Sequence, residues 1–160
     1  SLQNMKEDGS IVFGIDIMGQ GRPCLTIGCD EALAVTLDSN EVEDRKLLSQ
    51  QSRMGINLIQ DDVFEVKTAN KLRYEIDKRI AKKQKLGIVY FRPVSGMINH
   101  DTEYNLKFLY KYYLIPLYQK IEPGGVVMIE FDLFNKRQDD YIEDLKSTFR
   151  YKVQKCVPKP

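Results

Sequence analysis

Acidic residues and glycines stand where short apolar segments of the chain end. Asp16, Gly19 and Gly21 follow the first segment, Asp38 ends the second, and Asp61 follows the third. A carboxylate can accept hydrogen bonds from two ribose hydroxyl groups, and glycine lets the backbone approach a ligand closely. The same residue types also form turns, helix caps and hairpins. The pattern therefore fits either a ligand site or a set of structural turns.

The elements that would position these residues follow from hydrophobic periodicity. Short β-branched runs alternate with helical patterns. The predicted strands cover residues 11–15, 33–37, 56–59, 87–91 and 126–129. Strands separated by helices predict right-handed crossovers, so the predicted fold class is α/β, a Rossmann-like and mostly parallel sheet flanked by helices. Ligands of such sheets bind outside the carboxyl ends of the strands, where Gly14, Asp38 and Asp61 would gather.

One helix is indicated by strict spacing. Leu72, Ile76 and Ile80 recur every four residues and would share one face of a helix, with Thr68 as its N-cap. Carboxylates followed by cations predict another helix from residue 41. A helix from residue 139 and a last strand at 151–157 complete the predicted elements.

Two prolines mark irregular places. Pro23 can open a short helix that runs to about Cys29, because proline fits the first helical turn. Residues 24–27 could equally form a strand, which would make this region an antiparallel meander. In the helix predicted over 102–120, Pro116 should cause a kink or an early end, because proline lacks the N–H that the helix needs.

Several of these features follow one another in a particular order. The run 13–16 leads into a glycine-bearing loop, Asp38 ends the second strand, 61–62 are acidic, and the turn at 122–125 reads Glu-Pro-Gly-Gly. In this order residues 10–155 resemble class I S-adenosylmethionine-dependent methyltransferases, and most closely the FtsJ-like ribose 2′-O-methyltransferases. That family includes coronavirus-type nidoviral enzymes, so a viral origin is compatible with the resemblance.

The resemblance implies an RNA methyltransferase with S-adenosylmethionine as its cofactor. It also implies which residues would hold each part of that cofactor. The methionine part would lie against Gly14, Asp16 and Gly19, the ribose against Asp38, and the adenine near Asp61 or Asp62.

The family uses a Lys-Asp-Lys-Glu catalytic tetrad, and the sequence departs from it. Arg92 follows the fourth strand where the family has aspartate, and Glu130 lies in the fifth where it has lysine. On neighbouring strands these exchanged charges predict a salt bridge. Together with His100, on the loop after the fourth strand, they are the candidate catalytic residues. The exchange argues against the family's mechanism and favours the alternative of an inactive domain that binds protein or RNA.

A basic segment offers a candidate surface for RNA. Residues 67–85 contain eight Lys and Arg but only two Asp and Glu. Such a helix face can follow nucleic-acid phosphates, with Lys71, Lys78, Lys82 and Lys83 as the candidate contacts. A solvated basic helix with no partner is the alternative.

Composition excludes several classes of protein. Lys and Arg number 24 and Asp and Glu number 23, so the net charge of +1 gives no general attraction to nucleic acid or to anionic membranes. Three cysteines without zinc-ligand spacing predict a reducing, cytoplasmic location, with Cys24 and Cys29 as small buried residues. A single histidine makes a His-rich metal site unexpected. No apolar run is long enough to span a bilayer.

The predicted domain organisation is one methyltransferase-like domain over residues 1–160. The chain ends before the segment that would carry the family's final glutamate. We therefore expect either a reduced domain or a fragment of a longer polypeptide.

Overall fold

The computed structural model describes residues 1–36, 50, 52–91, 102–130, 143 and 147. The chain divides into two units, Ser1–Glu130 and Phe131–Pro160, and the fold described below is that of the first. The helix predicted from residue 41 and the strand predicted at 151–157 lie outside the described residues, as does nearly all of the helix predicted from residue 139. That residues 1–160 form a single domain stays a prediction.

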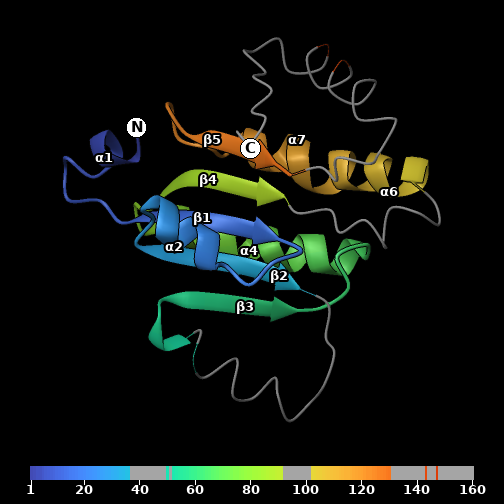
Figure 1. Ribbon diagram of the computed structural model, residues 1–160, viewed down its shortest axis with the longest axis horizontal. Coiled ribbons are helices and arrows are strands. Elements are labelled where there is room, and N and C mark those ends of the chain that lie inside the picture. The colour runs from blue at the N-terminus through green and yellow to red at the C-terminus, as the bar shows by residue number, and fades with distance from the viewer. Residues whose placement is uncertain (37–49, 51, 92–101, 131–142, 144–146, 148–160) are drawn as a thin grey trace, which may run out of the picture. The chain divides into compact units, whose positions relative to one another are not determined.

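The first unit is built on a five-stranded sheet in which every pair of neighbouring strands is parallel (Figure 1). The strand order is β3-β2-β1-β4-β5. The strands are β1 Val12–Ile17, β2 Glu31–Thr36, β3 Ile56–Gln60, β4 Lys85–Phe91 and β5 Val126–Ile129. This arrangement confirms the α/β, Rossmann-like fold, and the antiparallel meander is wrong.

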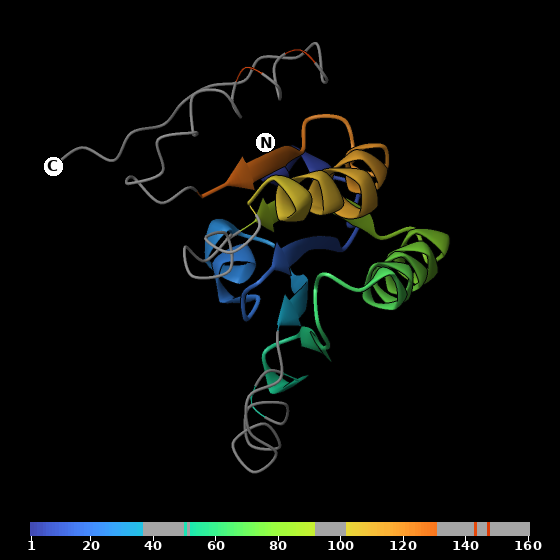
Figure 2. The same ribbon diagram turned by 90° about the vertical axis from the view of Figure 1, so that its right-hand side faces the viewer.

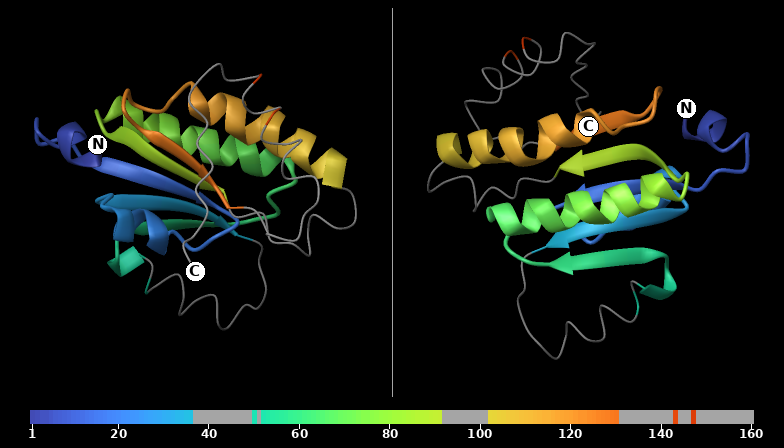
Figure 3. Two further views of the ribbon diagram at one scale, coloured as in Figure 1. Left: turned by 45° about the horizontal axis from the view of Figure 1, so that its top comes forward. Right: turned by 180° about the vertical axis from the view of Figure 1, so that it is seen from behind.

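Helices cover both faces of the sheet. The short α2, Arg22–Ile27, lies over β1 and β2 and has proline in its first turn, which confirms the helix predicted from Pro23 (Figure 2). On the opposite face lie α4, Val66–Ala81, and a continuous helical stretch after β4 (Figure 3). The four-residue α1, Leu2–Met5, packs near β4.

The helical stretch after β4 contains an irregular turn just before Pro116. It consists of α6 Thr102–Leu109, the π-helical turn η1 Tyr110–Leu114 and α7 Ile115–Tyr118. Pro116 cannot donate a hydrogen bond to the carbonyl of Tyr112, and a widened turn at this position accommodates the missing bond. The predicted disturbance near Pro116 is present, but the helix continues past the proline.

The start of α4, Val66–Ala81, differs from the prediction. Its N-cap is Glu65, while Thr68 lies inside the helix with no exposed surface. The helix begins earlier because Asp62 forms a turn in front of it, accepting the N–H of Phe64 at 2.9 Å. Of the predicted apolar face, Leu72 and Ile76 are fully buried, whereas Ile80 is 39% exposed.

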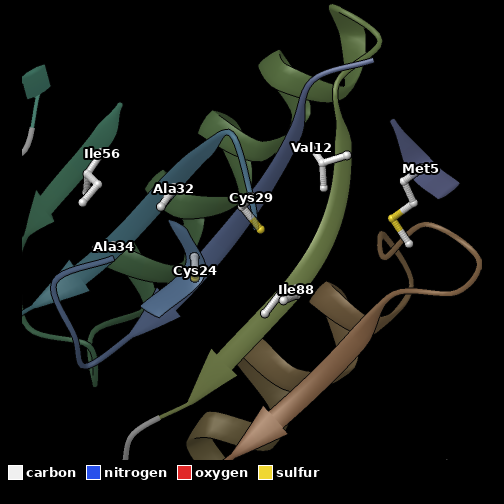
Figure 4. Close-up of a cluster of buried hydrophobic side chains, with 8 residues drawn as sticks. All are labelled: Met5, Val12, Cys24, Cys29, Ala32, Ala34, Ile56 and Ile88. Atoms are coloured by element: carbon white, nitrogen blue, oxygen red, sulfur yellow. The ribbon is translucent and has the colours of Figure 1, made fainter. Parts of the chain in front are cut away.

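The two sides of the sheet are packed with side chains of different size. Under α2 the strands present Gly14, Ala32 and Ala34, which leave room for Cys24 and Cys29 (Figure 4). On the side of α4 most buried side chains are larger, although Thr68 and Ala69 of α4 are buried there as well. The large ones include Phe13, Ile15, Ile17, Leu33, Leu72, Ile76 and Tyr113. The α2 side therefore brings helix and strands close together, and the α4 side forms an apolar core.

Candidate functional site

The loop after β1 is held by a buried carboxylate. Asp16 has no exposed surface, and its Oδ2 accepts the N–H of Gly21 at 2.8 Å. A Cβ at position 19 would collide with this carboxylate, and Gly21 has a φ of +82°, which favours glycine. Asp16, Gly19 and Gly21 therefore act together, because the carboxylate fixes the path of the loop that leads into α2.

A pocket opens beside this loop, at the carboxyl ends of β1 and β2. Its volume is about 650 Å³, a size suited to a small organic ligand. The described lining residues come from the loop, from α2 and from the end of β2, and the cation Arg22 is the one charged side chain among them. They are Met18, Gly19, Gln20, Arg22, Pro23, Thr26, Ile27 and Thr36.

Gly14 lies beneath α2. A Cβ at this position would stand 2.7 Å from the Cβ of Cys24 and 2.8 Å from its Sγ. The missing side chain therefore lets α2 approach β1, and a contact between Gly14 and a cofactor stays a prediction. Cys24 and Cys29 are both buried, as predicted, and burial raises the pKa of the Cys29 thiol to about 11.

The acidic pair after β3 has structural partners. Asp61 Oδ2 pairs with Lys71 Nζ at 3.0 Å, and the Asp61 N–H donates to the carbonyl of Thr36. Asp62 makes the turn in front of α4 described above. Both residues follow the carboxyl end of β3, and the pocket lies at the carboxyl ends of β1 and β2. A contact of either residue with adenine stays a prediction.

Sequence reasoning missed Gln60, the last residue of β3. It pairs in register with the pocket residue Thr36, and its Nε2 is buried without a hydrogen-bond partner among the described residues. The available signal was its spacing from Ile56 and Leu58. Gln60 lies two residues after Leu58 and four after Ile56, so it is a polar residue on the same, otherwise apolar, face of the strand.

At the ends of β4 and β5, Tyr90 Oη donates a hydrogen bond to Glu130 Oε2 at 2.5 Å. Glu130 is exposed. Three predicted site residues, Asp38, Arg92 and His100, lie outside the described residues, so the Arg92–Glu130 salt bridge stays a prediction. The described part of this edge holds a tyrosine–carboxylate pair.

The cations of segment 67–85 are largely neutralised. Within the described part of the chain, five of the eight have a carboxylate partner within 4 Å. The pairs are Lys67–Glu65, Lys71–Asp61, Lys78–Glu75, Arg79–Glu31 and Lys85–Asp8. Lys82 and Lys83 lie at the C-terminal end of α4. The helix has 16 residues, so this end is about 24 Å from its first residue, which lies near the carboxyl ends of the strands. RNA binding by Lys71, Lys78, Lys82 and Lys83 stays a prediction.

Comparison with known proteins gives no assignment: no protein-family model and no curated protein sequence matches the chain. Within the described residues, no helix is long and apolar enough to cross a membrane, and no cluster of three or more His, Cys, Asp or Glu side chains could hold a metal ion. The fold and the pocket together define a Rossmann-like α/β domain with a candidate ligand site after β1.

Proposed function

We propose that this chain binds S-adenosylmethionine in the pocket after β1 and is an RNA methyltransferase-like domain. The observation that carries the proposal is the pocket of about 650 Å³ beside the loop held by Asp16, at the carboxyl ends of β1 and β2. This is where open parallel sheets bind nucleoside-containing ligands. The choice of RNA as substrate comes from the resemblance to the FtsJ-like family. S-adenosylmethionine supplies an electrophilic methyl group.

The local chemistry favours a cofactor without a diphosphate. A diphosphate needs free backbone N–H groups after the first strand. Here the N–H of Gly21 is already donated to Asp16, and Pro23 in the first turn of α2 has none. The buried Asp16 carboxylate also disfavours a ligand with net negative charge, such as a dinucleotide, whereas S-adenosylmethionine carries a net positive charge. These features argue against a dinucleotide and fit the sulfonium cofactor.

The lining residues fit the parts of S-adenosylmethionine. Arg22 would pair with the carboxylate of the methionine part, and Thr36 would hydrogen-bond the nucleoside. Met18 and Ile27 provide apolar surface for the rest of the ligand. By resemblance, Asp38, two residues beyond Thr36, would hold the ribose.

Isothermal titration calorimetry tests the proposal. S-adenosylmethionine and its demethylated product S-adenosylhomocysteine should bind, and NAD should not. Arg22→Ala should weaken S-adenosylhomocysteine several-fold but leave 5′-methylthioadenosine, which has no carboxylate, unchanged. The matched control Lys82→Ala removes a cation at the C-terminal end of α4, away from the pocket. It should change the affinity for neither S-adenosylhomocysteine nor 5′-methylthioadenosine. Absence of binding heat at millimolar S-adenosylmethionine and S-adenosylhomocysteine would overturn the proposal.

A second candidate function is a non-catalytic domain that binds protein or RNA. It is favoured by Glu130, which stands where the FtsJ-like family has lysine and is hydrogen-bonded by Tyr90. A transfer assay with S-adenosylmethionine labelled in the methyl group distinguishes the two. Label incorporated into RNA would refute the second candidate, whereas cofactor binding without transfer would support it.

A further inference from the structure

Gln60 lies on the same side of the sheet as the pocket. In strand β3 it shares a face with Ile56, which is part of the core under α2, and with Leu58, which packs against that core. The register of β2 and β3 is regular and pairs Thr36 with Gln60. Paired residues of parallel strands point to the same face, and neighbouring strands are about 4.8 Å apart. Gln60 is therefore the immediate neighbour of a residue that lines the pocket.

The side-chain amide of Gln60 lacks a partner. Its Nε2 is buried, and no hydrogen-bond acceptor within the described part of the chain reaches it. Burying an amide without a hydrogen bond costs free energy, so native proteins rarely keep one unless a ligand or water satisfies it. Gln60 does not itself line the pocket, but its unsatisfied donor lies one strand away from the pocket residue Thr36, where a small side-chain rotation could present it to a ligand.

We propose that the Gln60 side chain recognises the adenine base of the ligand and determines its selectivity for that base. This inference rests on the proposed cofactor. A glutamine amide offers one donor and one acceptor side by side, and adenine presents an exocyclic amine beside a ring nitrogen. The amide Nε2 donates to the ring nitrogen, while Oε1 accepts from the amine. A purine without the amine leaves Oε1 unpaired.

The test compares S-adenosylhomocysteine with its analogue in which purine, lacking the 6-amino group, replaces adenine. Calorimetry on the full chain should show that wild-type protein prefers the adenine ligand by about tenfold, the size expected for one well-placed hydrogen bond. Gln60→Leu should bind both ligands with nearly equal affinity. The control Asn57→Leu removes an exposed amide from the other face of the same strand and should keep the wild-type preference.

Thermal unfolding provides a second readout. Without ligand, Gln60→Leu should unfold at a higher temperature than wild type, because leucine removes a buried and unpaired amide. If the variant is less stable without ligand, the amide is satisfied within the protein and the inference fails. If Gln60→Leu keeps the wild-type preference for adenine, the inference is overturned while the proposed cofactor stands. If wild-type protein binds neither ligand, the proposed function and the inference fail together.

Discussion

The two faces of the sheet differ in the side chains that they bury. On the α4 side, large side chains such as Phe13, Leu33 and Leu72 are fully buried. On the α2 side, small residues bring a six-residue helix close to the strands, and the Asp16 carboxylate and the Gln60 amide are buried beside the pocket. The α4 side also buries a polar group, the Thr68 hydroxyl, but it lies in an apolar core. Burial of a polar group opposes stability unless the group is hydrogen-bonded, as Asp16 is by Gly21. The difference therefore places the larger apolar core on the α4 side and the candidate ligand site on the α2 side.

The largest expected effect breaks the α4 side alone. Leu72→Ala removes a fully buried side chain and should lower the free energy of unfolding by about 2–5 kcal/mol. Urea denaturation measures this loss of stability. Calorimetry without urea, where the variant is still folded, should show unchanged affinity for S-adenosylhomocysteine. Ile80→Ala, at a position 39% exposed, is the matched control and should cost less. A loss at Leu72 no larger than that at Ile80 would contradict the assignment of the core.

A smaller loss of stability, with a larger effect on binding, is expected from Asp16. Asp16→Ala leaves the N–H of Gly21 buried without its acceptor and should cost about 1.5–3 kcal/mol. Because the loop then loses its fixed path, ligand affinity should fall as well. Asp16→Asn keeps an acceptor oxygen and should retain more of both properties. If folded Asp16→Ala binds the ligand with unchanged affinity, the loop after β1 is not part of the ligand site.

The smallest effect concerns pH. Burial raises the pKa of Cys29 from 9.0 to about 11, so the folded state holds this proton more tightly than the unfolded state does. The stabilisation is complete below pH 9 and is lost as pH rises toward 11, by about 1 kcal/mol at pH 10. Denaturation at several pH values should show that the free energy of unfolding falls less steeply with rising pH in Cys29→Ala than in the wild-type protein. Equal slopes in the two proteins would show that the thiol is not buried on the α2 side.

Periodicity and turn chemistry predicted most of the fold. Five apolar runs gave the five strands, and Pro23 gave the start of α2, because these signals are local. The first turn of α4 was placed wrongly at Thr68, since the Asp62 turn competes as a helix start. Boundaries of this kind depend on small differences between neighbouring caps.

Side-chain pairing across the fold was beyond sequence reasoning. The basic segment looked like an open cationic surface, but Arg79 pairs with Glu31, 48 residues away, and Lys85 with Asp8, 77 residues away. The missing partner of Gln60 likewise depends on which strands are neighbours. Sequence patterns report the faces of elements, whereas these contacts require the strand order.

Hydrogen–deuterium exchange with and without S-adenosylhomocysteine tests the central claim most directly, because it reports both faces of the sheet in one experiment. We expect the ligand to slow exchange in Met18–Ile27 and at the end of β3 around Gln60, and to leave α4 unchanged. Slowed exchange confined to α4, or no change anywhere at saturating ligand, would contradict the account.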